Sequence, residues 1–396
     1  MDTGQKIYRE DIKSLRVYNP ADILAPPVIN LHSKNGLEVN FDILSEDAEY
    51  LKYRLVHCNA DWQPSSLIES EYLDGFNEVP IEDYAFSSNT YVHYVNYNIS
   101  LPDPSLPIKK SGNYLLQVFP ENDPQTILLQ VRFSVTEDNA STYGLVSTRT
   151  DKGVNTEYQQ IYCNIDVSNL GNINPYQDIM VSIIQNNRPE TQRIIRNPGR
   201  IESSKVFFEH NPLLIFEAGN EYRRFETVRP DYPGMNIDSV KFKDGVWNAW
   251  IKQDFSREHK DYSFDKTQNG RFTIDDYNST DPNLGADYIK VHFTLNPEEY
   301  IQGKIFIDGE LTNHNFDETN RMLYDTNDGL FHQSLLLKQG SYNYQYVVIN
   351  DDGTLPSNRQ IEGNKYETNN EYLIQFFLRT PTDRADRLIS SSILRP

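Results

Sequence analysis

The chain has 396 residues, room for two to four domains, and a formal charge of −20 that repels phosphate backbones and anionic lipid heads, which argues against nucleic acid as a partner. Aromatic residues are mostly the 26 tyrosines and 19 phenylalanines, a balance that favours strands over helices. No apolar stretch approaches the roughly 20 residues of a membrane-spanning helix, so we expect no direct membrane insertion.

The first unit is predicted to span residues 1–138. Alternating apolar side chains predict strands near 12–18, 25–31, 37–44, 50–58, 91–100, 112–119 and 126–136. The last two strands flank a Pro-bracketed loop and are predicted to form a hairpin. Short strands at this spacing are typical of an immunoglobulin-like β-sandwich.

An aromatic-rich polar segment follows the strand near 50–58. It contains Trp62, Tyr72 and Phe76, which a sandwich core does not require. Because loops on rigid scaffolds often carry binding residues, we expect these three side chains to contact a partner. The structural alternative is that they seal the open end of the first sandwich.

The same segment carries the signals of a short helix. Ser66 and Glu69 fit a capping box, and Gly75 provides a stop about two turns later.

The second unit is predicted to span residues 139–284. Strands are expected near 158–167, 178–185, 191–196, 205–209, 213–218, 222–228, 238–242 and 246–252. Within it, Tyr222, Arg223 and Arg224 allow two interpretations. They either anchor an interface, as Tyr and Arg often do, or the arginines neutralise neighbouring carboxylates on a strand.

The third unit, residues 285–396, is predicted to be another sandwich, with strands in 289–295, 304–313, 329–353 and 372–378. The dipeptides Asp308-Gly309, Asp328-Gly329 and Asp352-Gly353 predict hairpin turns. With few short helices, the predicted fold class is all-β. Three consecutive immunoglobulin-like sandwiches are expected to form an elongated molecule.

The sequence contains no catalytic signature, and we expect no enzyme activity, catalytic residue, metal site or cofactor. The eight histidines are scattered singly, without the spacing that gathers metal ligands. A calcium-like run from Asp325 to Leu336 lacks the glutamate of its twelfth position and predicts a turn. Cys58 and Cys163 are expected to be buried free thiols, with a bridge between domains as the alternative.

Three stretches carry a family resemblance: LKYRLVHCNADWQPSSLIESEYLDGFN at 51–77, EAGNEYRRFE at 217–226 and LLLKQGSYNYQYVV at 335–348. They resemble the periplasmic plug proteins of the type IX secretion system. The resemblance implies a protein that docks on the periplasmic mouth of the outer-membrane translocon barrel. It would close the pore when no substrate is exported, and would associate with the outer membrane only through the translocon.

The first four residues have neither the basic start nor the apolar run of a signal peptide. The protein is therefore cytosolic or has lost such a peptide, and the resemblance favours the second possibility.

A carbohydrate-binding protein is the alternative function. The third unit is similar in plan to glycogen- and starch-binding modules, in which Tyr342 or Phe316 would stack on a sugar. Such modules hold sugars on tryptophan faces, whereas Trp62, Trp247 and Trp250 all lie in the first two units.

Overall fold

Short strands joined by tight turns form almost all of the regular structure, which a computed structural model describes over residues 3–33, 36–350 and 355–396. In these ranges each α-helix spans only four residues: α1 (Glu69–Tyr72), α2 (Pro175–Asp178), α3 (Pro282–Gly285) and α4 (Arg359–Glu362). Single 3₁₀ turns occur at η1 (Pro189–Thr191), η2 (Pro212–Leu214) and η3 (Glu310–Thr312). The predicted all-β class with few short helices is confirmed.

The first sandwich packs a six-stranded sheet against a four-stranded sheet. The larger sheet contains β1 (Lys6–Ile7), β10 (Leu129–Thr136), β9 (Gly112–Pro120), β5 (Leu51–Cys58) and β6 (Val79–Pro80) in that order, with β3 (Val28–Asn30) beside β10. The smaller sheet contains β2 (Ile12–Tyr18), β4 (Leu37–Ile43), β8 (Val95–Leu101) and β7 (Tyr84–Phe86). The predicted hairpin is confirmed as β9 and β10, which pair with Val118 opposite Leu129.

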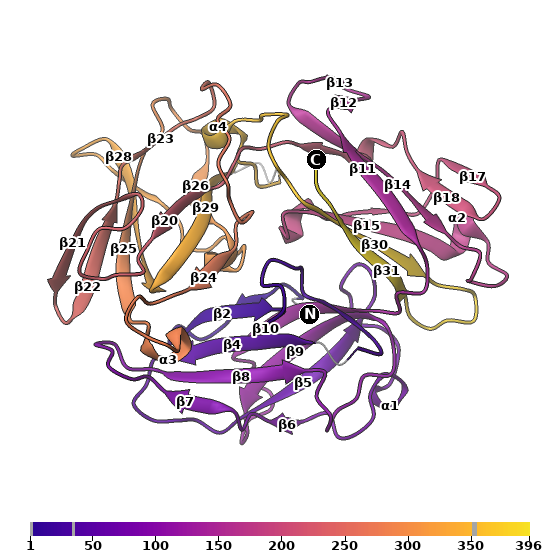
Figure 1. The fold of residues 1–396 in the computed structure, drawn as a ribbon, viewed down its shortest axis with the longest axis horizontal. Coiled ribbons are helices and arrows are strands. Elements are labelled where there is room, and N and C mark those ends of the chain that lie inside the picture. The colour runs from indigo at the N-terminus through magenta and orange to yellow at the C-terminus, as the bar shows by residue number, and fades with distance from the viewer. Residues whose placement is uncertain (1–2, 34–35, 351–354) are drawn as a thin grey trace.

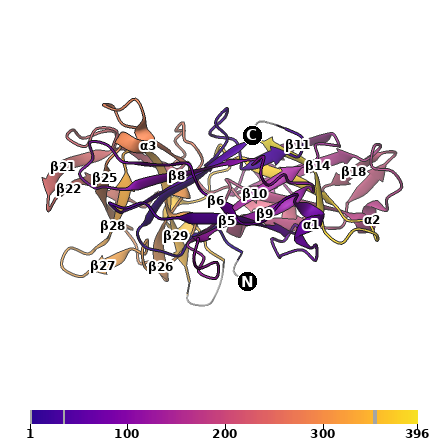
Figure 2. The same ribbon diagram turned by 90° about the horizontal axis from the view of Figure 1, so that it is seen from below.

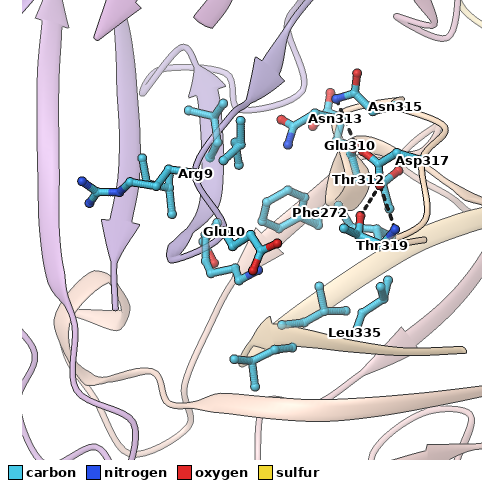
Figure 3. A pocket seen from close by; sticks show the side chains of 18 of the residues that line it. Arg9, Glu10, Phe272, Glu310, Thr312, Asn313, Asn315, Asp317, Thr319 and Leu335 are labelled. Carbon is cyan, nitrogen blue, oxygen red and sulfur yellow. Dashed lines mark hydrogen bonds between the residues drawn. The ribbon is translucent and has the colours of Figure 1, made fainter. Parts of the chain in front are cut away.

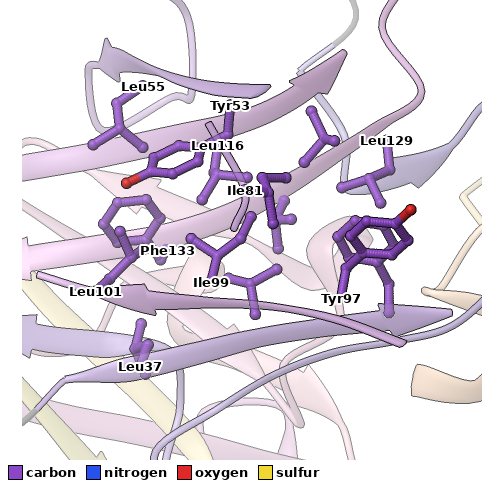
Figure 4. Packing of buried hydrophobic residues seen from close by; sticks show 14 of the residues in the cluster. Leu37, Tyr53, Leu55, Ile81, Tyr97, Ile99, Leu101, Leu116, Leu129 and Phe133 are labelled. Atoms are coloured by element: carbon purple, nitrogen blue, oxygen red, sulfur yellow. The ribbon is translucent and has the colours of Figure 1, made fainter. Parts of the chain in front are cut away.

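The core of the first sandwich follows from strand alternation, since every second side chain faces inward. Tyr53 and Leu55 of β5 point toward Ile99 and Leu101 of β8 (Figure 4).

The second sandwich draws its strands from two distant parts of the chain. One sheet contains β11 (Thr142–Ser147), β14 (Tyr158–Asp166), β18 (Lys205–Phe208), β17 (Arg200–Glu202) and β19 (Ile215–Glu217), and a small hairpin pairs β12 (Arg149–Thr150) with β13 (Gly153–Val154). The other sheet contains β16 (Arg193–Ile195), β15 (Ile179–Gln185), β30 (Tyr372–Leu378) and β31 (Arg387–Leu394). Figure 1 shows the yellow C-terminal strands beside the magenta β15.

The third sandwich lies between these two parts in the sequence. One sheet contains β20 (Arg223–Glu226), β29 (Gly340–Ile349), β24 (Phe272–Ile274) and β26 (Lys304–Asp308). The other contains β21 (Ile237–Lys243), β22 (Val246–Ile251), β25 (Tyr288–Asn296), β28 (Leu330–Lys338), β27 (Leu323–Asp325) and β23 (Asp254–Phe255).

The third sandwich is therefore an insertion in the second. The chain leaves and re-enters the second sandwich at one place, where Asn370 Nδ2 donates to the Ala218 carbonyl (2.6 Å) and Thr368 Oγ1 donates to the Gly219 carbonyl (3.0 Å). The boundary expected between 284 and 285 does not follow the sheets, because β22 pairs with β25 across it. Hydrophobic alternation reports where strands lie, and it contains no information on which distant strands pair.

The three sandwiches occupy the corners of a triangle, seen face-on in Figure 1 and edge-on in Figure 2. Each pair of sandwiches is in direct contact. Asp42 binds Lys338 between the first and third, Gln375 binds Ser134 between the second and first, and Arg271 binds Glu371 between the third and second. The expected elongated arrangement is wrong, because buried polar contacts close the triangle.

Two local expectations also differ from the structure. Helix α1 begins at Glu69 and makes one turn, and the Ile68 amide donates to Glu71 Oε2 (2.8 Å), so Ser66 and Glu69 do not form the capping box. Of the Asp-Gly pairs, Asp328-Gly329 joins β27 to β28, Asp308-Gly309 leads into η3, and Asp352-Gly353 lies outside the described residues.

Candidate docking surface

The aromatic segment after β5 has a buried part and an exposed part. Trp62 is 6% exposed and Tyr72 is 5% exposed, and the Tyr72 hydroxyl donates to the Leu55 carbonyl (3.2 Å). Phe76 is 75% exposed. Among the three predicted partner contacts, only Phe76 presents its ring to solvent.

The turn that carries Trp62 contacts the second sandwich. The Ala60 amide donates to Asp386 Oδ2 (3.0 Å), and the Asp386 amide donates to Asn59 Oδ1 (3.1 Å). Ser66 Oγ donates to the Arg384 carbonyl (3.0 Å). This part of the segment therefore recognises another part of the same chain.

The second predicted group, Tyr222 to Arg224, lies mostly inside the third sandwich. Arg223 Nη1 lies 2.7 Å from Asp254 Oδ1, and Arg223 Nε lies 3.0 Å from Glu362 Oε1. Burial alone would raise the pKa of Glu362, but the charges of Arg223 and Arg257, together with hydrogen bonds from Arg223 and the Tyr346 amide, outweigh burial and hold that pKa below its usual value.

Arg224 is the more exposed of the two arginines, and its Nη2 lies 2.7 Å from Asp265 Oδ1. Tyr222 is 3% exposed. These contacts favour the interpretation in which the arginines neutralise neighbouring carboxylates.

The outer edge of the first sandwich is a candidate docking surface. Strands β6 and β7 are each the last strand of their sheet, and residues 81–83 join them. Both lie on the side that faces away from the other two sandwiches (Figure 1). A terminal strand leaves backbone donors and acceptors unpaired, which makes it a template for another chain.

Four exposed aromatic side chains accompany this edge. Tyr84 and Phe86 lie on β7 and are 38% and 53% exposed, and Phe76 precedes β6. Tyr50, 77% exposed, immediately precedes β5, which pairs with β6. We call Tyr50, Phe76, Tyr84 and Phe86 the aromatic edge.

A pocket of about 450 Å³ lies between the first and third sandwiches (Figure 3). Phe272 and Leu335 contribute apolar surface, while Arg9 and Asp317 contribute charge. Asp317 accepts hydrogen bonds from the backbone and hydroxyl of Thr319, so this carboxylate caps a turn.

The described residues give no evidence for a metal site or for a sugar-binding site. Within residues 3–33, 36–350 and 355–396, no group of three His, Cys, Asp or Glu side chains is placed to hold a metal ion. Tyr342 is 1% exposed and stacks at 5.1 Å on both Phe225 and Phe272, so it cannot stack on a sugar. Phe316 packs against Phe306.

The cysteines agree with the sequence prediction. Cys58 and Cys163 are buried and free, one in each of the first two sandwiches. Burial raises the pKa of the Cys58 thiol to about 12 and raises that of Cys163 further.

None of the helices in the described part of the chain has the length and apolar character needed to cross a membrane.

Comparison with known proteins gives the family. The profile described as Type 9 secretion system plug protein 1st domain matches residues 12–137, which hold the first sandwich. A crystal structure of a hypothetical protein from Parabacteroides merdae ATCC 43184 is 35% identical, with a TM-score of 0.97 over 100% of both chains. The chain belongs to the type IX secretion system plug protein family. A search of curated proteins gave no match.

The family profile covers the sandwich that carries the aromatic edge. Sequence reasoning singled out Phe76 but missed Tyr50, Tyr84 and Phe86. The spacing of Tyr84 and Phe86, two residues apart in a polar stretch, was the available signal, since such residues share a strand face.

Proposed function

We propose that this plug-family protein closes the periplasmic mouth of the type IX translocon barrel when no substrate is exported, and that it does so without catalysis. Membership in the plug family, with the first sandwich matched by the family profile, is the observation that carries this proposal. The protein would be periplasmic, held at the outer membrane only through the translocon. Trp247 and Trp250 lie on β22 of the third sandwich and not in the second, but their rings pack against Phe242 and His292, and no observation in the described residues favours carbohydrate binding.

The first sandwich would dock through its aromatic edge. A stable contact with the barrel needs about 1,000 Å² or more of buried surface, centred on aromatic anchors with a polar rim. Tyr50, Phe76, Tyr84 and Phe86 supply such anchors, and Glu78, Glu82 and Asp83 lie between them in sequence. The exposed side of β7 could add main-chain hydrogen bonds to a strand of the partner.

The test is retention of the purified protein on immobilised translocon barrel. We expect the wild-type protein to bind, and the Phe76→Ala/Phe86→Ala double variant to bind at least about tenfold more weakly, since aromatic anchors often contribute 2 kcal/mol or more. Tyr300→Ala is the matched control, because Tyr300 is 91% exposed on the third sandwich.

The same proteins should be added to barrels reconstituted in planar bilayers. Wild type and Tyr300→Ala should abolish ion conductance, whereas the double variant should not. If wild type fails to bind the barrel, the plug function is wrong. If wild type and the folded double variant bind equally, only the docking edge is wrong.

A further inference from the structure

A small cavity lies where the three sandwiches meet. Its volume is about 70 Å³. The first sandwich contributes Gln5, Leu15, Arg16, Val17, Pro27, Val28, Trp62, Arg132, Phe133 and Ser134; the second contributes Ile184, Asn187, Pro189, Leu373 and Gln375; and the third contributes Glu310, Asn313 and His314. This volume exceeds the roughly 10–15 Å³ that one water needs, so a small ligand fits. We call it the junction cavity.

Polar groups from different sandwiches pair with one another around the junction cavity. Gln5 Nε2 donates to Asn313 Oδ1 (3.0 Å), and Gln375 Nε2 donates to Ser134 Oγ (3.1 Å). These two hydrogen bonds connect lining residues of different sandwiches, so the donors and acceptors that they use are not available to a ligand.

The indole of Trp62 is an exception. Within the described residues its Nε1 has no hydrogen-bond partner, although Trp62 is only 6% exposed. Trp62 also has a φ of +64°, a conformation that bulky residues rarely adopt. The Arg132 guanidinium carbon lies 4.5 Å from the ring centre and so covers one face of the indole. A strained backbone at a residue that lines a cavity and holds a buried, unpaired donor points to a ligand.

His314, a lining residue from the third sandwich, shows the same combination. Its Nδ1 lies 2.9 Å from Asp308 Oδ1, so Nε2 is on the edge of the ring that Asp308 does not occupy. Within the described residues Nε2 has no partner, the side chain is 5% exposed, and φ is +52°.

The residues that line the junction cavity carry more positive than negative charge, while Asp308 and Glu190 act on His314 from outside the lining. Arg16 and Arg132 are positive, and Glu310 is the acidic residue of the lining, 3.8 Å from the Arg271 guanidinium outside it. Burial lowers the pKa of His314, but the charge and hydrogen bond of Asp308, together with the charges of Glu190 and Glu310, outweigh burial and raise that pKa above its ordinary value. A protonated imidazole can only donate, as can an indole N–H.

We propose that the junction cavity binds one small anion of the halide or carboxylate class, which accepts hydrogen bonds from Trp62 Nε1 and His314 Nε2. Water suits two donors less well, because a water that accepts hydrogen bonds from both must still place its own two hydrogens. The anion would contact all three sandwiches and would therefore stabilise only the closed triangle.

Bromide is the probe for the test, because it can be located by anomalous scattering. In crystals of the wild-type protein grown in sodium bromide, we expect an anomalous peak in the cavity within hydrogen-bonding range of Trp62 Nε1 and His314 Nε2. A cavity that contains only waters under these conditions overturns the proposal. This measurement requires no variant to fold.

Thermal unfolding tests the same site in solution. At constant ionic strength, replacing gluconate, which is too large for the cavity, with bromide or acetate should raise the melting temperature saturably. Trp62→Phe and His314→Asn should each weaken the apparent anion affinity by about tenfold or more, since each removes a hydrogen bond to a charged group. Trp250→Phe, outside the cavity, is the matched control.

A linear, non-saturable effect of the salts in wild type would contradict specific binding. Unchanged affinity in both folded variants would also overturn the assignment of the donors.

Discussion

At the scale of single residues, one buried ion pair joins the first sandwich to the third. Asp42 Oδ2 lies 2.7 Å from Lys338 Nζ, and both side chains are 1% exposed. The Tyr288 hydroxyl donates to the same carboxylate (2.7 Å). A buried pair adds little net stability against a hydrophobic replacement, but removing one partner leaves an uncompensated charge.

Lys338→Met should therefore lower the free energy of unfolding by about 3–5 kcal/mol. The double variant Asp42→Asn/Lys338→Met should lose clearly less, because the remaining amide is neutral. Urea unfolding of the three proteins measures both losses. Equal losses for the single and double variants would contradict this account.

His314 should make stability depend on pH. The pKa of His314 is raised in the folded protein, by the negative charges of Asp308, Glu190 and Glu310 acting against burial. Its contribution is present below the unfolded pKa of about 6.5 and is lost as pH rises through the folded pKa.

Between pH 6 and 8 the melting temperature of wild type should fall more than that of His314→Asn. Above pH 8 Lys338 acts in the opposite direction, because burial lowers its pKa to about 8 and the unfolded chain then holds more protons. The comparison is therefore made below that pH. Parallel pH profiles for wild type and variant would exclude His314 as the source.

At the scale of elements, the sequence predicted the positions of strands where the signal lies within the strand itself. Alternation located β2, β4, β5, β9 and β10, because inward and outward side chains differ in polarity within each strand. Tyr342, Tyr344 and Tyr346 of β29 are spaced two residues apart, which predicts that they share one face of the strand, and all three lie in the core of the third sandwich.

Other features depend on contacts between distant residues. Nothing near Trp62 in sequence indicates that Asp386 binds its turn or that Trp62 lines the junction cavity. The partner of β15 is β30, and a strand pattern does not identify its neighbour. For the same reason, the sequence alone could not separate Phe76, which is exposed, from Tyr72, which is buried.

Strand β30 should be essential to the second sandwich. Phe376 is fully buried and packs 5.8 Å from Phe208, so Phe376→Ala should cost about 3–5 kcal/mol. Cys163 lies in the same core and Cys58 does not. A thiol reagent should therefore modify Cys163 faster in the variant than in wild type, with Cys58 unchanged.

Peptide mapping of the modified cysteines measures this difference. Fully denatured, unreduced wild type should give two equivalents, as expected of free thiols. Faster reaction at both cysteines would show that the two sandwiches lose structure together.

At the scale of the whole molecule, the insertion defines which pieces can fold alone. Residues 139–284 contain β15 without β30, and strands of the third sandwich without β29. Residues 138–219 joined by a short Gly-Ser linker to 370–396 contain both sheets of the second sandwich. The linker can be short, because Ala218 and Asn370 are hydrogen bonded.

We expect the joined protein to unfold cooperatively and to protect Cys163 from thiol reagents, whereas the contiguous fragment 139–284 should remain unfolded. Circular dichroism during heating distinguishes them. A cooperative transition in the contiguous fragment would show that the pairing of β15 with β30 is dispensable.

The insertion also sets an order of events during folding. Strands β11 to β19 emerge before the third sandwich, but β15 must wait for β30, nearly two hundred residues later. Long-range pairing is slow, and an apolar strand with an open edge is prone to wrong association while it waits. The second sandwich is therefore the last to close, and until it does the protein is most exposed to aggregation.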